Sequence, residues 1–284
     1  RILFIGGGFI SFEFGHIAAR AGSEVCMIDR GERPLKGFDA DLVERLVARG
    51  EEVGVQLRRR TSLKSIKKDG TDFLVTVETG SETKDLRADL VVQGAGRVAA
   101  IDQLDLAAAN VEAGDKGVAV NAYLQSTSNP KIYAAGDAAD TQGAPLTPVA
   151  VFEGKVAASN MLKGNRTKPD YSGVPSAVFT VPELTRVGML EQDAREAGHD
   201  IRVVENDTGD WYSNLRVGES CAATKVIIDK DSDTILGAHL LGPEYGEIIN
   251  FFGLAIRLGL TTSDLKKMVS VYPSVGSDLG SMLS

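Results

Sequence analysis

The sequence predicts an α/β protein that begins with a Rossmann-like domain, carries an inserted β-meander and ends in an α+β domain. Residues 1–28 combine a short apolar strand, three consecutive glycines, a helix with an apolar stripe and a second apolar strand. Residues 62–88 then hold three alternating stretches separated by Asp-Gly and Thr-Gly turns. Beyond residue 170, short β-type stretches are followed by two helical ones, which is typical of an α+β arrangement.

The glycine turn at the start of the chain indicates a dinucleotide site. Gly6 and Gly8 occupy the first two glycine positions of G-x-G-x-x-G, and Ser11 stands at the third. Asp29 ends the second strand, 23 residues after Gly6. In such a unit the diphosphate lies on the free N–H groups of the helix N-terminus, and the acid accepts hydrogen bonds from a ribose. The alternative is a structural βαβ unit that merely contains a glycine turn.

Length, composition and charge limit the class of protein. The chain has 284 residues, which corresponds to about two domains. Its net charge is −8 and it has no basic tract, so binding to nucleic acid has no electrostatic support. No apolar run approaches the roughly 18 residues of a membrane span, and Cys26 and Cys221 are too few for a disulfide framework. We therefore expect a cytoplasmic protein with neither a nucleic-acid nor a membrane partner.

The other elements follow from the same patterns. Residues 90–93 form a continuous apolar run, which predicts a central parallel strand. Pro148 fits the first turn of a helix that continues to Lys163, because its missing N–H would be unpaired there. The polar stretch 164–171 predicts a linker. Helices are also expected at 39–53, 244–258 and 262–269, and strands at 55–57, 118–120, 131–134, 176–179, 201–205, 222–228 and 234–241.

Four separated motifs resemble those of one enzyme family. They are GGGFISFEF at 6–14, GAGR at 94–97, IYAAGD at 132–137 followed by LTPVA at 146–150, and ILGAHLLGPEYGEIIN at 235–250. Together they resemble the flavin-dependent pyridine nucleotide–disulfide oxidoreductases, the family of glutathione reductase, dihydrolipoamide dehydrogenase and mercuric reductase. The resemblance covers essentially the whole chain.

The resemblance implies three domains. Residues 1–97 correspond to the NAD(P)-binding domain, residues 98–169 to the C-terminal part of the FAD-binding domain, and residues 170–284 to the dimerisation (interface) domain of a homodimer. The chain begins inside its first strand, so we expect it to be a fragment that lacks the first part of the FAD domain and the redox cysteine pair usually carried there. The implied cofactors are NAD or NADP, and FAD in the full-length protein.

The resemblance also assigns site residues. In the nucleotide domain it places Gly6, Gly8, Phe9, Ile10, Ser11, Glu13, Asp29, Arg30, Lys36 and Gly96. In the FAD domain it places Gly136, Asp137, Leu146, Thr147 and Pro148, with Asp137 on the ribityl chain and the helix N-terminus aimed at the flavin ring. Phe9 matches an aromatic gate that stacks where nicotinamide binds, with a core phenylalanine as the alternative. Glu13 matches a catalytic acid that pairs with a lysine near the flavin, with a plain surface residue as the alternative.

The choice between NAD and NADP stays open. A carboxylate at Asp29 accepts two ribose hydroxyl groups and repels a 2′-phosphate, which favours NAD. Arg30 and Lys36 match places where NADP-using relatives carry cations that clamp that phosphate, and they also fit a solvated turn.

The C-terminal stretch SVYPSVGSDLG at 270–280 departs from the family pattern. Most disulfide-reducing relatives carry a histidine and an acid here, which move protons for a thiolate pair. Tyr272 and Ser277 occupy these two positions, and Asp278 follows one residue late. Ordinary dithiol exchange is therefore in doubt. Mercuric reductase has a tyrosine at this place, although the C-terminal cysteine pair of that enzyme is missing, and packing at a dimer contact is the structural alternative for Tyr272.

Two classes of function follow. The first is a flavin-dependent oxidoreductase that transfers hydride from NAD(P)H through FAD to a disulfide or related small-molecule acceptor, with the present chain an inactive fragment. A mercuric reductase-like metal reductase is a variant of this class, but no metal-ligand cluster is visible in the sequence. The second is a nucleotide-binding and dimerisation module without redox activity.

Overall fold

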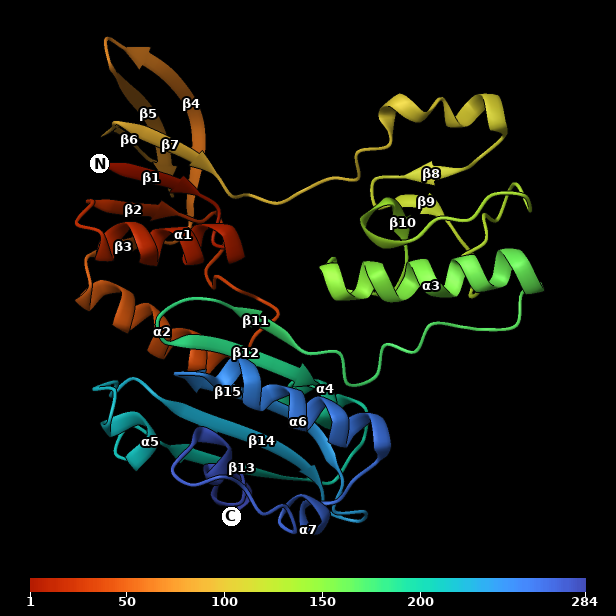
Figure 1. Ribbon diagram of the computed structural model, residues 1–284. Coiled ribbons are helices and arrows are strands. Elements are labelled where there is room, and N and C mark those ends of the chain that lie inside the picture. Colours follow the sequence, from red (N-terminus) through yellow and green to blue (C-terminus); the bar gives the residue numbers. More distant parts are fainter. The chain divides into compact units, whose positions relative to one another are not determined.

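The computed structural model describes residues 1–284 and consists of two compact units (Figure 1). One unit joins Arg1–Gly96 to Pro175–Ser284, and the other is Arg97–Val174. The first and the last thirds of the chain therefore share one folded body. The finer division into domains at 1–97, 98–169 and 170–284 stays a prediction.

A four-stranded parallel sheet forms the centre of the N-terminal part. Its order is β3-β2-β1-β7, with β1 at Ile2–Ile5, β2 at Val25–Ile28, β3 at Val55–Arg58 and β7 at Leu90–Gln93. Helices α1 (Phe9–Arg20) and α2 (Ala40–Glu52) pack against one face. The prediction of a central strand at 90–93 is wrong: β7 pairs only with β1, and Leu90 is half exposed. A continuous apolar run does not distinguish a central strand from an edge strand whose faces are partly covered.

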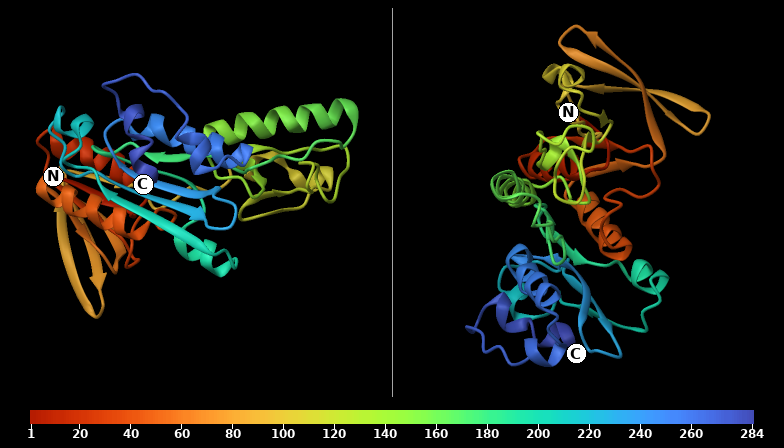
Figure 2. Two further views of the ribbon diagram at one scale, coloured as in Figure 1. Left: turned by 90° about the horizontal axis from the view of Figure 1, so that it is seen from below. Right: turned by 90° about the vertical axis from the view of Figure 1, so that its right-hand side faces the viewer.

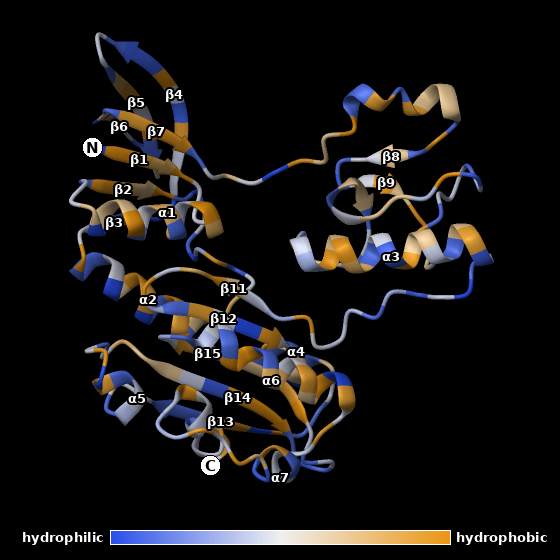
Figure 3. Ribbon diagram, viewed as in Figure 1, coloured by the Kyte–Doolittle hydropathy of each residue, from blue (hydrophilic) through white to orange (hydrophobic).

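The inserted meander covers the other face of this sheet. It consists of β4 (Thr61–Asp69), β5 (Asp72–Thr79) and β6 (Glu82–Ala88), paired antiparallel as predicted. Val75 and Val77 of β5 pack against Leu3 and Ile28 of the parallel sheet. The hairpin of β4 and β5 extends away from the parallel strands (Figure 2), and its far end is mostly hydrophilic (Figure 3).

The C-terminal part is built on a five-stranded antiparallel sheet. Its order is β11-β12-β15-β14-β13, with bounds Ser176–Val178, Glu183–Gly188, Ile235–Gly242, Ala223–Asp229 and Ile201–Asp207. Helix α6 (Tyr245–Leu258) packs on one face. The remaining short elements are α4 (Glu191–Glu196), α5 (Tyr212–Leu215), α7 (Thr262–Leu265), η4 (Val275–Asp278) and η5 (Ser281–Leu283).

One strand of this part was missed, and the expected end of one helix is wrong. Strand β12 was not predicted, because Glu183 and Arg186 interrupt its apolar pattern. Helix α7 ends at Leu265 rather than at residue 269, although its start is fixed by a capping box between Thr261 and Asp264.

A shared core explains why the two ends of the chain fold together. Phe4 and Phe12 of the parallel-sheet region and Leu42 and Leu46 of α2 belong to the same buried cluster as Leu241 of β15. Apolar side chains of β11, β12 and β14 complete this cluster. Burial of this kind stabilises a fold in proportion to the apolar area removed from water, so the nucleotide-type domain and the C-terminal sheet support each other.

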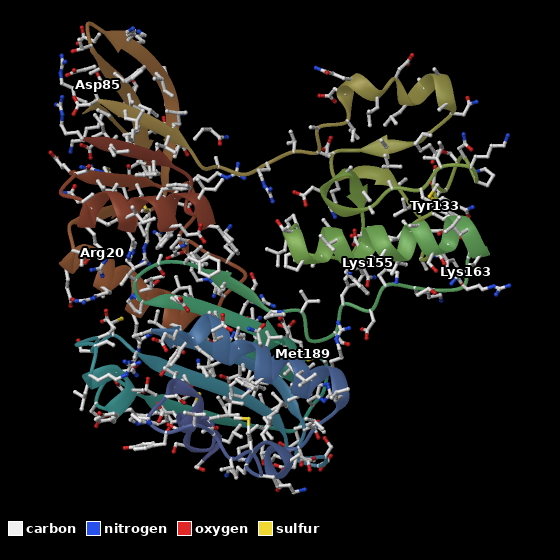
Figure 4. The ribbon with its side chains drawn as sticks, viewed as in Figure 1. Arg20, Asp85, Tyr133, Lys155, Lys163 and Met189 are labelled. Carbon is white, nitrogen blue, oxygen red and sulfur yellow. The ribbon has the colours of Figure 1, made fainter.

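The second unit is smaller. It contains a three-stranded sheet of β8 (Ala113–Gly114), β9 (Gly117–Ala119) and β10 (Ala139–Asp140), the helix α3 (Thr147–Lys163), and the 3₁₀ turns η1 (Asp102–Leu104), η2 (Leu106–Ala109) and η3 (Gly136–Ala138). The strand expected at 131–134 is wrong. Tyr133 makes only an isolated bridge to Gln125, and its hydroxyl donates to Asn165 Oδ1 at 2.7 Å. Figure 4 labels Tyr133 together with Lys155 and Lys163 of α3.

None of the helices combines the length and the apolar character that crossing a bilayer requires.

Candidate functional site

The turn between β1 and α1 requires glycine at two positions for steric reasons. Gly6 has φ +100°, and a Cβ there would lie 2.6 Å from Ala95 Cα. A Cβ on Gly7 would overlap Asp29 Oδ2. The backbone of this turn is therefore packed tightly against the ends of β2 and β7, which fixes the position of the helix that follows.

Gly8 differs from its two neighbours because its lack of a side chain leaves open space. Its backbone is extended, with φ −97°, and a Cβ there would meet only Gly94 O, at an ordinary 3.5 Å. Gly8 is also the N-cap of α1, and no side chain caps this helix end. The first intrahelical bond runs from Phe12 N–H to Gly8 O at 3.2 Å, so the N–H groups that precede it have no partner within the helix, and those of the exposed residues Phe9 and Ile10 remain available to a ligand.

Ser11 replaces the third glycine of the motif, and the structure shows how it fits. Its side chain is completely buried and its Oγ has no hydrogen-bond partner. A Cβ on Gly94 would overlap this Oγ. The Ser11 side chain therefore fits because Gly94, at the end of β7, has no side chain of its own.

The carboxylate of Asp29 lies at the edge of the glycine turn. Its Oδ1 accepts a hydrogen bond from Gly31 N–H at 2.7 Å, and its Oδ2 faces Gly7. Arg30 and Lys36 are exposed and form no ion pair, and the Lys36 side chain lies beside Gly31. The structure therefore brings together the acid that favours NAD and the two cations that favour NADP.

Phe9 and Glu13 project from the first turns of α1. Phe9 is 36% exposed and packs against Phe38, with ring centroids 5.4 Å apart. Glu13 Oε1 accepts a hydrogen bond from Phe179 N–H at 2.9 Å, a contact that the sequence did not indicate. Near the end of the same helix, Arg20 donates to Val181 O at 2.9 Å (Figure 4). Helix α1 is thus tied at two points to the segment that follows β11.

The residues assigned to FAD lie in the second unit. Gly136, with φ +66°, precedes Asp137, whose carboxylate is partly exposed and lies 3.1 Å from the Arg97 guanidinium. Leu146 is the N-cap of α3 and has no side-chain cap bond, and Pro148 lies in the first turn, as predicted. Gly96, with φ +115°, ends the other unit and has open space around its Cα.

Glu153 of α3 is a residue that the sequence reasoning missed. It is completely buried, and its Oε2 accepts a hydrogen bond from Gly136 N–H at 2.6 Å. Its Oε1 accepts from Thr141 Oγ1 at 2.8 Å and from Tyr171 OH at 2.6 Å. Burial, together with this carboxylate, raises the pKa of Tyr171 to about 12, so the phenol remains a donor. Glu153 therefore holds the turn that carries Asp137. In the sequence, the only local sign of this role is a charged residue on an otherwise apolar helix face.

The C-terminal residues at the family's histidine and acid positions are not arranged as a dyad. Tyr272 is 75% exposed and stacks on Tyr212, with centroids 6.3 Å apart. Ser277 Oγ donates to Ser274 O, whereas Asp278 accepts a hydrogen bond from Ser213 Oγ. The acid that follows one residue late is therefore engaged with a serine and not with the Tyr272 hydroxyl.

The histidines and cysteines do not supply the missing groups. His239 is buried in β15, where its Nε2 donates to Met189 O at 2.9 Å and its Nδ1 has no hydrogen-bond partner. His199 contacts Asp229 at the surface. Burial raises the pKa of the Cys221 thiol to about 11, which keeps it protonated at neutral pH. No group of three or more potential ligands lies close enough together to hold a metal ion.

A mixed α/β fold with an uncapped helix N-terminus above a glycine turn is the arrangement found in dinucleotide-binding proteins. Comparison with known families identifies it further. Residues 1–154 match the pyridine nucleotide-disulphide oxidoreductase family, and residues 174–282 match the dimerisation domain of the same family. The chain belongs to the pyridine nucleotide-disulphide oxidoreductases, and the resemblance inferred from its motifs is confirmed.

Individual relatives include both short and long proteins. An uncharacterised 19.7 kDa protein in a mercuric resistance operon of Staphylococcus aureus is 51% identical over 180 residues, which is 63% of this chain and 100% of that protein. Mercuric reductase of Bacillus cereus is 32% identical over 280 residues, covering 98% of this chain and 44% of the enzyme. The HOCl-induced flavoprotein disulfide reductase RclA of Escherichia coli, solved as a Cu(II) complex, superposes with a TM-score of 0.89 at 28% identity, covering 99% of this chain and 63% of that one.

The chain thus spans only about half of the long reductases that it matches.

Proposed function

We propose that this chain binds NAD(P)H at the N-terminus of α1 as part of a flavin-dependent oxidoreductase. The observation that carries the proposal is Gly8: its extended backbone, open side-chain space and uncapped helix end leave a row of N–H groups accessible to a diphosphate. Asp29 stands at the ribose position of the same turn. The tight packing at Gly6 and Gly7 keeps this arrangement preformed.

The residues of the chain would have distinct tasks. The amide groups of Phe9 and Ile10 bind the diphosphate, Asp29 accepts ribose hydroxyls, and the Phe9 ring, backed by Phe38, stacks at the nicotinamide side. FAD, when bound, would supply the hydride and electron transfer of the family. In the second unit, Asp137 would accept hydrogen bonds from the ribityl chain, and the uncapped N-terminus of α3, at Thr147 and Pro148, would favour negative charge near the flavin ring.

The acceptor is a disulfide or a related small molecule in this proposal. Proton transfer by a histidine dyad is not part of it, because Tyr272 is an exposed phenol stacked on Tyr212 and Asp278 is bound to Ser213. A tyrosine at this position is the observation that favours a metal reductase as a variant. Two mercuric reductases, from Bacillus cereus and Staphylococcus aureus, are among the relatives that align over 98% of the chain.

A second candidate is a nucleotide-binding and dimerisation module without redox activity. It is favoured by the 19.7 kDa relative, whose whole length of 180 residues aligns with part of this chain. Homodimerisation is common to both candidates. It is supported by α6, which buries Ile248 and Phe252 against its own sheet while Phe251, Leu254 and Leu258 remain exposed on another face.

Titration of the purified chain with NADPH and NADH, combined with a visible spectrum, separates these candidates. Saturable binding, together with flavin absorbance and NAD(P)H oxidation once free FAD is supplied in excess, supports the oxidoreductase. Nucleotide binding by a protein that takes up no added FAD supports the module. Absence of binding to either nucleotide would refute both.

A further inference from the structure

The loop between β2 and α2, residues 30–39, forms one wall of the nucleotide site. Leu35 N–H donates to Gly7 O at 2.9 Å, which fastens the loop to the glycine turn. Lys36 is the cation beside the ribose position, and Phe38 packs behind Phe9. The position of this loop therefore determines both the adenosine side and the aromatic support of the site.

The far end of the loop is held by residues of the C-terminal sheet. Arg186 of β12 donates from one guanidinium nitrogen to Gly37 O, and from the other to Gly188 O at 3.0 Å. Arg186 thus bridges its own strand to the loop. Gly37 is exposed, so water could satisfy its carbonyl oxygen without a protein donor. The contact fixes a backbone position and does not satisfy a buried group.

A buried lysine makes the second attachment. Lys225 of β14 is 5% exposed, and its Nζ lies 3.1 Å from Asp39 Oδ2, 2.5 Å from Asp41 Oδ2 and 3.3 Å from Glu205 Oε1. Burial opposes its charge, but the hydrogen bond to Asp41 and the charge of Asp39 outweigh this effect and raise the pKa of Lys225. The lysine therefore stays charged across the physiological pH range.

Asp39 connects this lysine to the loop. Its Oδ1 caps α2 by accepting hydrogen bonds from Asp41 N–H at 3.1 Å and Leu42 N–H at 3.2 Å, while its Oδ2 faces Lys225. The same side chain thus ends the loop, starts α2 and attaches both to β14. Arg186 and Lys225 hold the two residues, Gly37 and Asp39, that flank Phe38.

We propose that Arg186 and Lys225 are positioning residues for nucleotide binding: they hold loop 30–39 from the C-terminal sheet without touching the nucleotide themselves. This inference rests on the proposed NAD(P)H site. Holding a loop in its bound conformation improves affinity because the entropy cost of ordering it is met before the ligand arrives. It gives the C-terminal domain a role in nucleotide affinity in addition to dimerisation.

The test uses the full chain and calorimetric titration with NADPH and NADH. Arg186→Ala removes the contact to Gly37 O and is expected to weaken binding about three- to tenfold. Arg186→Lys retains a donor and is expected to restore most of the affinity. Asp39→Asn keeps the N-cap of α2 but removes the charge facing Lys225, and is expected to weaken binding about threefold. Arg195→Ala, which removes an exposed arginine from α4 in the same domain, serves as the matched control and should bind like the wild type.

Thermal unfolding of each variant separates positioning from folding. Weaker binding by Arg186→Ala and Asp39→Asn, with a wild-type unfolding midpoint and rescue by Arg186→Lys, supports the inference. Wild-type affinity in both variants overturns it, as does a loss of affinity that follows a fall in the unfolding midpoint. If the wild-type chain binds neither nucleotide, the proposed function itself fails, which is a different result from unchanged affinity in the variants.

Discussion

Gly8 allows a sharp test of the nucleotide site because its role can be separated from folding. A side chain at Gly6 or Gly7 would collide with Ala95 or Asp29 within the protein, so substitutions there report on the fold. At Gly8 the backbone is extended, a conformation open to every residue, and a Cβ would make only an ordinary contact with Gly94 O at 3.5 Å. We therefore expect Gly8→Ala and Gly8→Val to fold with a loss of stability of about 1 kcal/mol, the usual cost of replacing a favourable N-cap residue.

Their effect on binding should be large. A methyl group at Gly8 would lie where the diphosphate is proposed to approach the N–H groups of Phe9 and Ile10. Loss of one charge-assisted hydrogen bond costs about 1.5–3 kcal/mol, so Gly8→Ala should weaken NAD(P)H binding about 10- to 150-fold. The larger, β-branched side chain of Gly8→Val should abolish binding.

The assay is calorimetric titration alongside thermal unfolding. Gly114→Val is a suitable control, because nothing lies within 4 Å of a Cβ at this strand position in the other unit. The control should bind like the wild type. Unchanged affinity in Gly8→Val would show that the diphosphate does not bind at this turn, and the reasoning would be refuted.

Three further predictions concern cofactor content, assembly and pH. The purified chain should lack stoichiometric FAD, because the residues proposed to contact the flavin belong to only one turn and one helix start; a strong flavin spectrum that survives gel filtration would contradict this. Light scattering should give twice the 30.1 kDa chain mass, since Phe251, Leu254 and Leu258 leave a second apolar face on α6, whereas a monomer at micromolar concentration would contradict a dimer. Burial, aided by the charge of Arg20, lowers the pKa of His16 from 6.5 to about 4. In the unfolded chain the imidazole keeps its ordinary pKa of about 6.5, so the unfolded chain takes up the proton first as the pH falls. The free energy of unfolding therefore has its full value above pH 6.5 and decreases as the pH falls from 6.5 through 4. Urea unfolding should show that the free energy of unfolding of the wild type falls by about 2 kcal/mol between pH 7 and pH 5, and that this decrease is absent from His16→Phe. Equal decreases in the two proteins would contradict the role given to His16.

Local patterns in the sequence predicted the elements that depend on local physics. The glycine turn, α1, α2, the β-meander and α3 follow from glycine, capping residues and periodicity, each of which acts over a few residues. The family assignment followed from the same motifs. Strand β12 was missed because its charged residues, Glu183 and Arg186, are paired with partners far away in the chain.

The missed parts of the site have the same cause. Glu153 binds Gly136 and Tyr171, and Lys225 binds Asp39, which lies 186 positions earlier in the sequence. No local pattern shows such a pairing. Two predictions from local sequence patterns were wrong because they did not take the neighbouring strands into account. The apolar run of β7 lies at an edge of the sheet, and residues 131–134 form only an isolated bridge.

The central claim is that a dinucleotide binds at the N-terminus of α1. A crystal structure of the chain with NADPH, and another with NADH, tests this most directly. The account predicts density for the diphosphate over the N–H groups of Phe9 and Ile10 and for the adenosine ribose beside Asp29. Density for the nucleotide at any other place, with this turn filled only by solvent, would contradict it.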